Sequence, residues 1–308
     1  MKKTIYHTIV LAIAMASTSG CEKEIPISTE DSAPKAVLNT IINCTANINS
    51  VKLSESVSLF SPAEAARIEN PSLQLKINGS DKEIAFDTYR GVDSYYRFAE
   101  PLSPGDRVEI GGSTPKHGAF SGFDYAPLPA EIVSVSTEWF RGKVNDMSYL
   151  RTLIKIRDNP DARNYYRIVI RDKTLFDAEA DESAFPWNLQ DVYVDQEIIF
   201  NNISGIGGED DHVYRVFSDD LFQGKEYTLN VYIRKDRFND YDYESVRHFV
   251  KVEIHALSEN LYKYLRSLEQ ASVEDNFQEP VKIFSNVSGG YGIVAIYNVS
   301  DKVVEVEE

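Results

Sequence analysis

Cys21 is the residue whose position most clearly implies a chemical reaction. It directly follows Ser17-Thr18-Ser19-Gly20, and Lys2 and Lys3 precede an apolar run from Thr8 to Ala16. A basic start, a short apolar stretch and small residues at the cleavage point are typical of a signal peptide. Cleavage after Gly20 would place a thiol on the new first residue, where it can accept diacylglycerol. The pattern therefore predicts a signal peptide over residues 1–20 and lipidation of Cys21.

Two other interpretations of this segment need to be weighed. Thr18 stands where a lipoprotein signal usually has leucine, so an ordinary secretory peptide cut nearby remains an alternative. A spanning helix requires ~20 apolar residues, and the run from Thr8 to Ala16 covers only about half of that length. Two or three acyl chains on one cysteine hold a protein firmly to a bilayer. We therefore expect a chain that is anchored to a membrane and does not cross it.

Residues 21–35 have the composition of a linker behind a lipid anchor. Glu22-Lys23-Glu24 resembles the short acidic tag that directs Bacteroidota lipoproteins to the outer cell surface, although a solvated tether looks similar. Asp31-Ser32-Ala33 resembles the O-glycosylation site of the same bacteria, which makes Ser32 a candidate for glycosylation. The expected location is the outer membrane, with the cell surface favoured over the periplasmic face.

An acidic, tyrosine-containing segment is the next place where chemistry could occur. Its tyrosines, Tyr241 and Tyr243, interrupt acidic residues and are candidates for stacking on a sugar or a peptide. Its carboxylates offer the hard oxygen ligands that calcium prefers. The calcium candidates are Asp236, Asp240, Asp242 and Glu244. The spacing and the glycine of an EF-hand are missing, so a solvated loop is the simpler interpretation, and no cofactor is expected.

Residues suited to catalysis are few. Glu253 and His255 share one face of a predicted strand and could converge on a metal, but the sequence identifies no third ligand. We find no nucleophile elbow, no phosphate-binding glycine loop and no cysteine pairs at zinc spacing. Cys44 lies in a strand-like run and is expected to be a buried small apolar residue. The sequence therefore favours a protein that is not an enzyme, with a surface hydrolase kept as the least favoured alternative.

The charge of the chain limits its partners. The formal net charge is −16, and removal of residues 1–20, which hold two lysines and no acidic residue, makes it −18. A polyanion is repelled by such a field and finds no basic stripe. Nucleic acid is therefore excluded as an expected partner.

The elements that must position these residues are mainly β-strands, because apolar residues alternate with polar ones in short runs that are separated by turn residues. We expect two domains after the linker: an immunoglobulin/transthyretin-like β-sandwich over residues 36–129, and a larger antiparallel β domain, sandwich or barrel-like, over residues 130–308. A helix is predicted near residues 258–270, capped by Ser258.

Local signals give further expectations. Residues 150–172 are predicted to form a hairpin, and the runs 227–233 and 246–254 an antiparallel pair. Glycines and prolines from residue 111 to residue 129 predict a long loop. A short helix is expected over residues 63–68, and closing strands over residues 281–285 and 293–297.

Three motifs in a fixed order carry a resemblance to a known family. They are Ile154-Lys155-Ile156-Arg157-Asp158 with Asn164-Tyr165-Tyr166, then residues 217–225, then Glu279-Pro280-Val281 with residues 285–293. On these motifs the chain is similar to the domain of unknown function 4249 family of Bacteroidota outer-membrane lipoproteins. The resemblance covers residues from about 36 to the last, and it transfers no catalytic residue.

The resemblance implies a function through the genes that accompany the family. Its members are typically encoded beside TonB-dependent receptors, so the expected function is that of a binding or accessory component of a TonB-dependent nutrient-uptake system. The expected partner is a TonB-dependent receptor, and the ligand, whether a small molecule, a glycan or a peptide, stays unknown. The alternative is a fimbrillin-like structural or adhesive surface subunit, which would require strand exchange between subunits.

Overall fold

The fold is taken from a computed structural model that describes residues 33–57, 66–69, 71–141, 148–175, 185–190, 215–234, 238, 246–272 and 281–307. The chain divides into two compact units, one made of Met1–Ala33 and Ser58–Pro62 and the other of Pro34–Val57 and Ala63–Glu308. Nearly all described residues belong to the second unit, and the description below concerns that unit.

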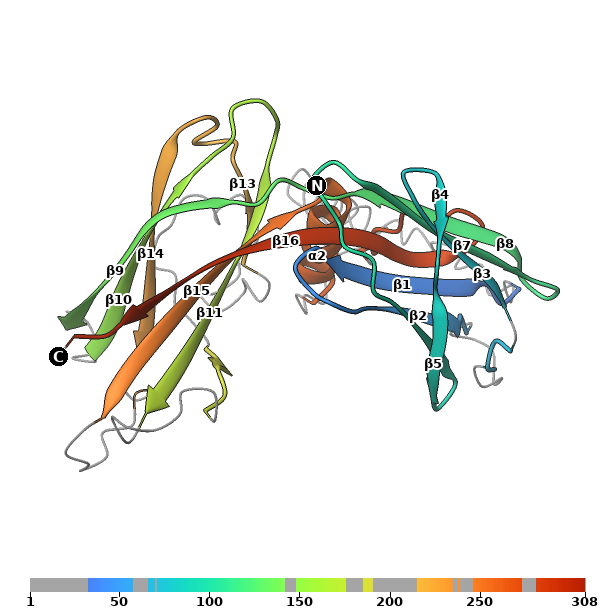
Figure 1. Cartoon of the computed structure of the whole chain (residues 1–308), viewed down its shortest axis with the longest axis horizontal. Helices are drawn as coiled ribbons and strands as arrows, with labels where there is room; N and C mark the ends of the chain where they lie inside the picture. Colours follow the sequence, from blue (N-terminus) through green and yellow to red (C-terminus); the bar gives the residue numbers. More distant parts are fainter. Residues whose placement is uncertain are drawn as a thin grey trace, which may run out of the picture. The chain divides into compact units, whose positions relative to one another are not determined.

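The second unit is mostly β, as the sequence predicts, with one helix in its described part (Figure 1). The elements are β1 (Ala36–Asn43), β2 (Asn49–Glu55), β3 (Ser72–Ile77), β4 (Ser80–Lys82), β5 (Ala85–Arg90), β6 (Asp93–Phe98), β7 (Arg107–Thr114), β8 (Gly118–Tyr125), β9 (Glu131–Arg141), β10 (Ser148–Arg157), β11 (Tyr165–Leu175), β12 (Asn188–Leu189), β13 (Val216–Ser218), β14 (Glu226–Arg234), β15 (Arg247–Leu257), α2 (Glu259–Ser272) and β16 (Tyr291–Glu305).

Three open sheets contain these strands. The largest runs β12-β11-β15-β16-β1-β2-β6-β5, with β13 paired to β11, while a four-stranded sheet runs β4-β3-β7-β8 and a three-stranded sheet runs β14-β10-β9. Because each sheet ends in edge strands, the sheets are open, and the sandwich is the one of the predicted alternatives that is observed.

The strand β16 pairs with strands in both halves of the large sheet. Residues Tyr291 to Tyr297 pair in parallel with β1, and Tyr297 to Glu305 pair antiparallel with β15 (Figure 1). Val294 and Ile296 consequently lie in one core with strands from residues 36–126. The predicted division into residues 36–129 and 130–308 stays a prediction.

The four-stranded sheet packs on the β1, β2, β6 and β16 part of the large sheet. Leu38 and Leu53 from the large sheet and Leu75 and Ile110 from the smaller one are at most 1% exposed and share one core. Alternation along each strand puts these apolar side chains on one face and leaves polar residues on the other. This is the β-sandwich that the sequence predicts.

A second sandwich forms where β14, β10 and β9 pack on β11 and β15. Its core contains Ile154 and Leu229 from the three-stranded sheet and Ile168 and Ile254 from the large one. Helix α2 packs Leu261 and Leu265 against a third cluster that includes Ile293 and Ala295. The predicted helix and its cap are confirmed, since the Leu261 N–H donates to Ser258 Oγ at 3.1 Å.

Several local predictions are wrong, mostly because alternation defines a buried face but not a neighbour. Residues 150–172 are not a hairpin: β10 pairs with β9 and β14, and β11 pairs with β12, β13 and β15. The runs 227–233 and 246–254 do not pair either, since β15 lies between β11 and β16. Residues 111–125 are not a loop but the paired strands β7 and β8.

Two further local predictions concern the closing strands and a short helix. Residues 281–285 have no strand structure, although β16 covers the predicted strand over residues 293–297. Of the expected helix over residues 63–68, residues 63–65 lie outside the described residues, and residues 66–68 are not helical, so the prediction is wrong for that half.

Candidate functional site

The outward face of the four-stranded sheet, β4-β3-β7-β8, carries a cavity lined mainly by small and polar residues. Leu75 and Ile110 point into the sandwich core, so Gln74, Gly111 and Ser121 at the alternate positions point away from it. These three residues form one cross-strand row, because Gln74 pairs with Gly111 and Gly111 with Ser121. Ser288 adds a further backbone bridge to Ser121 at the edge of the sheet.

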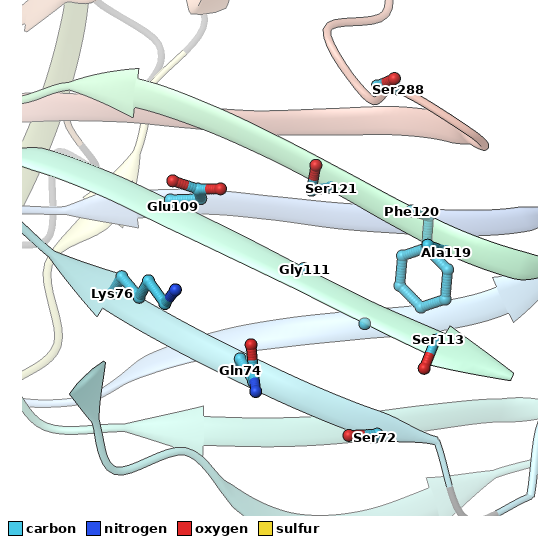
Figure 2. Close-up of a pocket in the computed structure, with 11 residues that line it drawn as sticks. Ser72, Gln74, Lys76, Glu109, Gly111, Ser113, Ala119, Phe120, Ser121 and Ser288 are labelled. Carbon is cyan, nitrogen blue, oxygen red and sulfur yellow. The ribbon is translucent and has the colours of Figure 1, made fainter. Parts of the chain in front are cut away.

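This face is hollowed into a cavity of about 420 Å³, which we call the polar trough (Figure 2). Lys76 and Glu109 lie at one end of it, and Ser72 and Ser113 lie at the other (Figure 2). The residues that line it are Ser72, Gln74, Lys76, Glu109, Gly111, Gly112, Ser113, Ala119, Phe120, Ser121 and Ser288.

Two adjacent glycines lie where β7 approaches its neighbours closely, Gly111 on the outward face and Gly112 on the core face. A Cβ on Gly112 would lie 2.8 Å from both Leu73 Cδ2 and Phe120 Cζ, and one on Gly111 would lie 3.0 Å from Ser121 Cβ. Glycine in a strand often marks such a close approach. Because Gly111 also occupies the middle of the outward row, no side chain fills the centre of the trough.

Aromatic and charged residues continue the face beyond the trough. Phe123 and Tyr125 are 45% and 53% exposed, and their rings lie 6.0 Å apart at 90°. Phe123 pairs with Glu109, and the Arg107 guanidinium lies 4.3 Å from the Phe123 ring centroid. Arg107 also donates to Glu109 at 2.5 Å. One end of the face therefore carries small, uncharged side chains. The other end carries aromatic rings and charged side chains that contact one another.

The trough offers groups for binding rather than for bond chemistry. Serine hydroxyls both donate and accept hydrogen bonds, and the Gln74 amide does the same through separate atoms. The lining contains no histidine or cysteine and no nucleophile beside a base. This arrangement can hold a polar ligand by hydrogen bonds.

Behind the same sheet, Asp124 connects β8 to β16 and α2. Its carboxylate, 4% exposed, accepts hydrogen bonds from the N–H of Ile296 at 3.1 Å and from the Asn260 side chain at 3.0 Å. Burial raises the pKa of Asp124 to about 6, against the opposing effect of hydrogen bonds that include the Ser258 hydroxyl. Since Asp124 is held on several sides, the end of β8 that carries Phe123 and Tyr125 is fixed in place.

The residues Glu253 and His255, which the sequence places on one strand face, lie together on β15. His255 Nε2 is 3.3 Å from Glu253 Oε2, while Arg171 Nε donates to Glu253 Oε1 at 3.0 Å and Lys251 Nζ lies 3.4 Å from it. We call Arg171, Lys251, Glu253 and His255 the charged ladder. Burial would raise the pKa of Glu253, but the hydrogen bond to His255 and the charges of Arg171 and Lys251 lower it to about 2.

The charged ladder has no arrangement for holding a metal. No group of three or more metal-ligating side chains occurs in the part of the chain that the structure describes. Glu253 already interacts with two cations and a histidine, so its position is explained by an ion-pair network.

Most of the candidates singled out from the sequence lie outside the described residues. This applies to Cys21, Ser32, Asp236, Asp240, Tyr241, Asp242, Tyr243 and Glu244. Cys44 is half-buried against the N-terminal core, and burial, followed by the charge of Asp106, raises the pKa of its thiol to about 11. Cys44 therefore packs against the core as expected but is only partly buried, where full burial was predicted.

Sequence reasoning missed the polar trough. The available signal was glycine and serine at alternate positions of strand-like runs, such as Gly111 and Ser113, but glycines in this stretch were interpreted as loop residues. Only one face of these strands is apolar. The residues at the alternate positions are mainly small and polar, and this pattern is the signal that could have indicated the trough.

Comparisons with known proteins identify the family. The family model described as "Domain of unknown function (DUF4249)" matches residues 22–303. No curated protein shows significant sequence similarity to the chain. Among the described residues, no helix combines the length and the hydropathy that crossing a bilayer requires. The matched range includes every element of the fold except the last residues of β16.

Proposed function

The chain belongs to the domain of unknown function 4249 (DUF4249) family, and we propose that it is a lipid-anchored outer-membrane protein that binds a ligand for a TonB-dependent nutrient-uptake system. Its lipid is attached at Cys21, its location is the cell surface, and its partner is a TonB-dependent receptor. The protein captures or passes on a ligand without breaking a covalent bond.

The observation that carries the binding role is the polar trough. A cavity of about 420 Å³ falls within the range of small-ligand sites, which is roughly 300–1,000 Å³. Its lining of serines, a glutamine and glycines supplies hydrogen-bonding groups on a rigid sheet. An all-β fold in a family of unknown function gives no sign of catalysis.

The anchor and the location rest on the first residues of the chain. A basic start, an apolar run and small residues before Cys21 support export and lipidation. The acidic residues after Cys21 support surface display. The receptor partner rests on the family resemblance of the motifs over residues 154–166, 217–225 and 279–293.

Replacement of Cys21 tests the anchor. In Cys21→Ala the acceptor thiol is absent, so we expect the protein to move from the membrane to the soluble fraction with its thermal unfolding unchanged. The matched control is Cys44→Ala, which removes the other cysteine and should stay in the membrane fraction. Membrane association of Cys21→Ala equal to that of Cys44→Ala would disprove lipid anchoring at this residue.

An affinity purification tests the function. The tagged lipoprotein is purified from detergent-solubilised outer membranes, next to a tagged lipoprotein of unrelated sequence, and the bound proteins are identified by mass spectrometry. A TonB-dependent receptor in near-equal amount is the expected result. Recovery of only the protein itself, in ladders of increasing size, would contradict the uptake role and support a fimbrillin-like subunit.

A further inference from the structure

We propose that the polar trough binds an uncharged oligosaccharide, with the Phe123 ring stacking on one sugar next to the trough. This inference rests on the proposed function in one respect only, namely that the chain binds a ligand. It goes further by assigning the chemical class of that ligand and the side chains that recognise it.

The hydrogen-bonding groups of the trough match sugar hydroxyls. A sugar hydroxyl both donates and accepts, and so does each serine hydroxyl, while the Gln74 amide provides a donor and an acceptor side by side. Ser72, Ser113, Ser121 and Ser288 surround the central Gly111, so such groups are present on several sides of the cavity. A purely apolar ligand would leave these groups without partners, which is costly once water is displaced.

The charges of the trough argue for a neutral ligand. Its charged lining residues are Lys76 and Glu109, which pair across β3 and β7 at one end, and Arg107 donates to Glu109. Glu109 is the acidic residue at this end, next to Lys76 and Arg107, and the whole chain carries −16. An anionic polysaccharide would be repelled by the net charge of the protein, which favours a neutral ligand.

The shape of the face suits a short chain of sugars. Outward positions from Ser72 to Lys76 on β3 span roughly 14 Å at ~3.4 Å per residue, and the neighbouring strands β7 and β8 run alongside them. Gly111 has no side chain to project into the middle of this path, which is lined there by Gln74 and Ser121. An extended ligand can therefore lie along the strands without meeting an obstruction at the centre.

Phe123 provides the stacking surface. It is two residues beyond Ser121 on the same face of β8, and its ring is 45% exposed. Its backbone carbonyl accepts from the Asn286 side chain at 3.0 Å, the Arg107 guanidinium lies over one face of its ring, and the Tyr125 ring lies at 90° to it. A sugar would stack on the face opposite Arg107. Because the ring is held before a ligand arrives, little conformational entropy is lost when a sugar stacks on it.

The test uses the full-length lipoprotein in detergent, run on native gels that contain one soluble polysaccharide each. The neutral probes are dextran, laminarin, galactomannan and xyloglucan, and the comparison probes are polygalacturonate, heparin and a peptide digest of gelatin. We expect at least one neutral probe to slow migration, and oligosaccharides of that probe to bind in calorimetric titrations. Retardation by no neutral probe, or only by the anionic or peptide probes, would overturn the proposal.

Two variants with matched controls locate the binding. Phe123→Ala should weaken oligosaccharide binding about tenfold and Gln74→Ala about fivefold, as expected for one lost stacking contact and one lost pair of hydrogen bonds. Phe86→Ala on β5, where the ring is 47% exposed, and Gln270→Ala on the exposed side of α2 should bind like the natural protein. Equal affinity in the test and control variants would show that the trough is not the site.

The proposed ligand class and the proposed uptake function can each fail without the other. Receptor recovery in the affinity purification does not depend on Phe123 or Gln74 in this scheme. Recovery of the receptor together with no binding of neutral probes would reject the ligand class alone. Binding of a neutral probe that is lost in Phe123→Ala, without receptor recovery, would reject the uptake role alone.

Discussion

Two sheet faces that point away from the sandwich cores carry side chains of opposite kinds. On β11 and β15 the outward residues are long and charged, and Glu253 is engaged by Arg171, Lys251 and His255. On β3, β7 and β8 the corresponding positions hold serine, glutamine and glycine around an open trough. Charged side chains that satisfy one another leave little for a ligand, whereas small side chains leave both space and hydrogen-bonding groups.

The same contrast governs the buried carboxylates of the two regions. Asp124 and Glu253 are 4% and 7% exposed, yet the pKa of Asp124 is raised to about 6 and that of Glu253 is lowered to about 2. Burial disfavours the charge of both groups. Two cations and a histidine reverse that effect at Glu253, but the hydrogen-bond donors at Asp124 are neutral and do not.

The largest expected effect comes from adding a side chain on the core face of the sheet that carries the trough. In Gly112→Val the new side chain would collide with Leu73 and Phe120, which lie 2.8 Å from the position of a Cβ. We expect the free energy of unfolding to fall by about 3 kcal/mol, measured by urea denaturation. Ser113→Val, on the exposed neighbouring position, should change it by less than about 0.5 kcal/mol. Equal stabilities for the two variants would mean that the strands do not depend on a bare Gly112.

Breaking the charged ladder should have the next largest effect. In Glu253→Gln, Arg171 and Lys251 lose their shared carboxylate, and we expect a loss of roughly 2 kcal/mol at pH 7 after allowance for solvent screening. The folded pKa of about 2 lies below the ordinary value of 4.5, so this contribution is present above pH 4.5 and is lost as pH falls toward 2. Denaturation curves at pH 7 and pH 3 should show the difference from the natural protein shrinking.

The exposed pair of Glu226 with Arg157 provides the matched control for that experiment. Glu226→Gln removes a carboxylate whose pKa is lowered mainly by its hydrogen bond to Arg157. Since both partners are solvent-exposed, stability should hardly change. A loss as large as that of Glu253→Gln would mean that burial does not distinguish the ladder from a surface ion pair.

A smaller effect of opposite sign is expected at Asp124. Its folded pKa of about 6 lies above the ordinary 3.8, so its contribution is fully present below pH 3.8 and is lost as pH rises through 6. Lowering the pH from 7.5 to 5 should stabilise the natural protein by about 1.4 kcal/mol relative to Asp124→Asn. The readout is the difference between the two proteins across thermal unfolding curves. A constant difference at all pH values would show that Asp124 does not titrate in this range.

The sequence predicted faces and one helix better than it predicted neighbours. Alternation of Ile168 and Ile170 with Arg167 and Arg171 indicated which side of β11 is buried, and Ser258 indicated where α2 begins. Alternation gives no information about which strand is the hydrogen-bonded neighbour, so the pairing of β11 with β15 rather than β10 could not be derived. Partner choice depends on packing between residues far apart in the chain.

The candidate site was missed for a related reason. Gly111 and Gly112 are turn formers in isolation, and only the neighbouring Leu73, Phe120 and Ser121 show that they allow strands to approach closely. The composition of the trough is visible in the sequence, but its outward direction depends on pairing with β3 and β8. The acidic candidates over residues 236–244 lie outside the described residues and stay predictions.

The two-part pairing of β16 has a consequence for the order in which the protein matures. Val37 near the start of β1 finds its partner in Tyr291, and β15 needs residues as late as Glu305. Neither sandwich can acquire its shared strand until almost the entire sequence has been synthesised, and contacts this distant slow the search for the native state. Both cores therefore stay incomplete until β16 is in place.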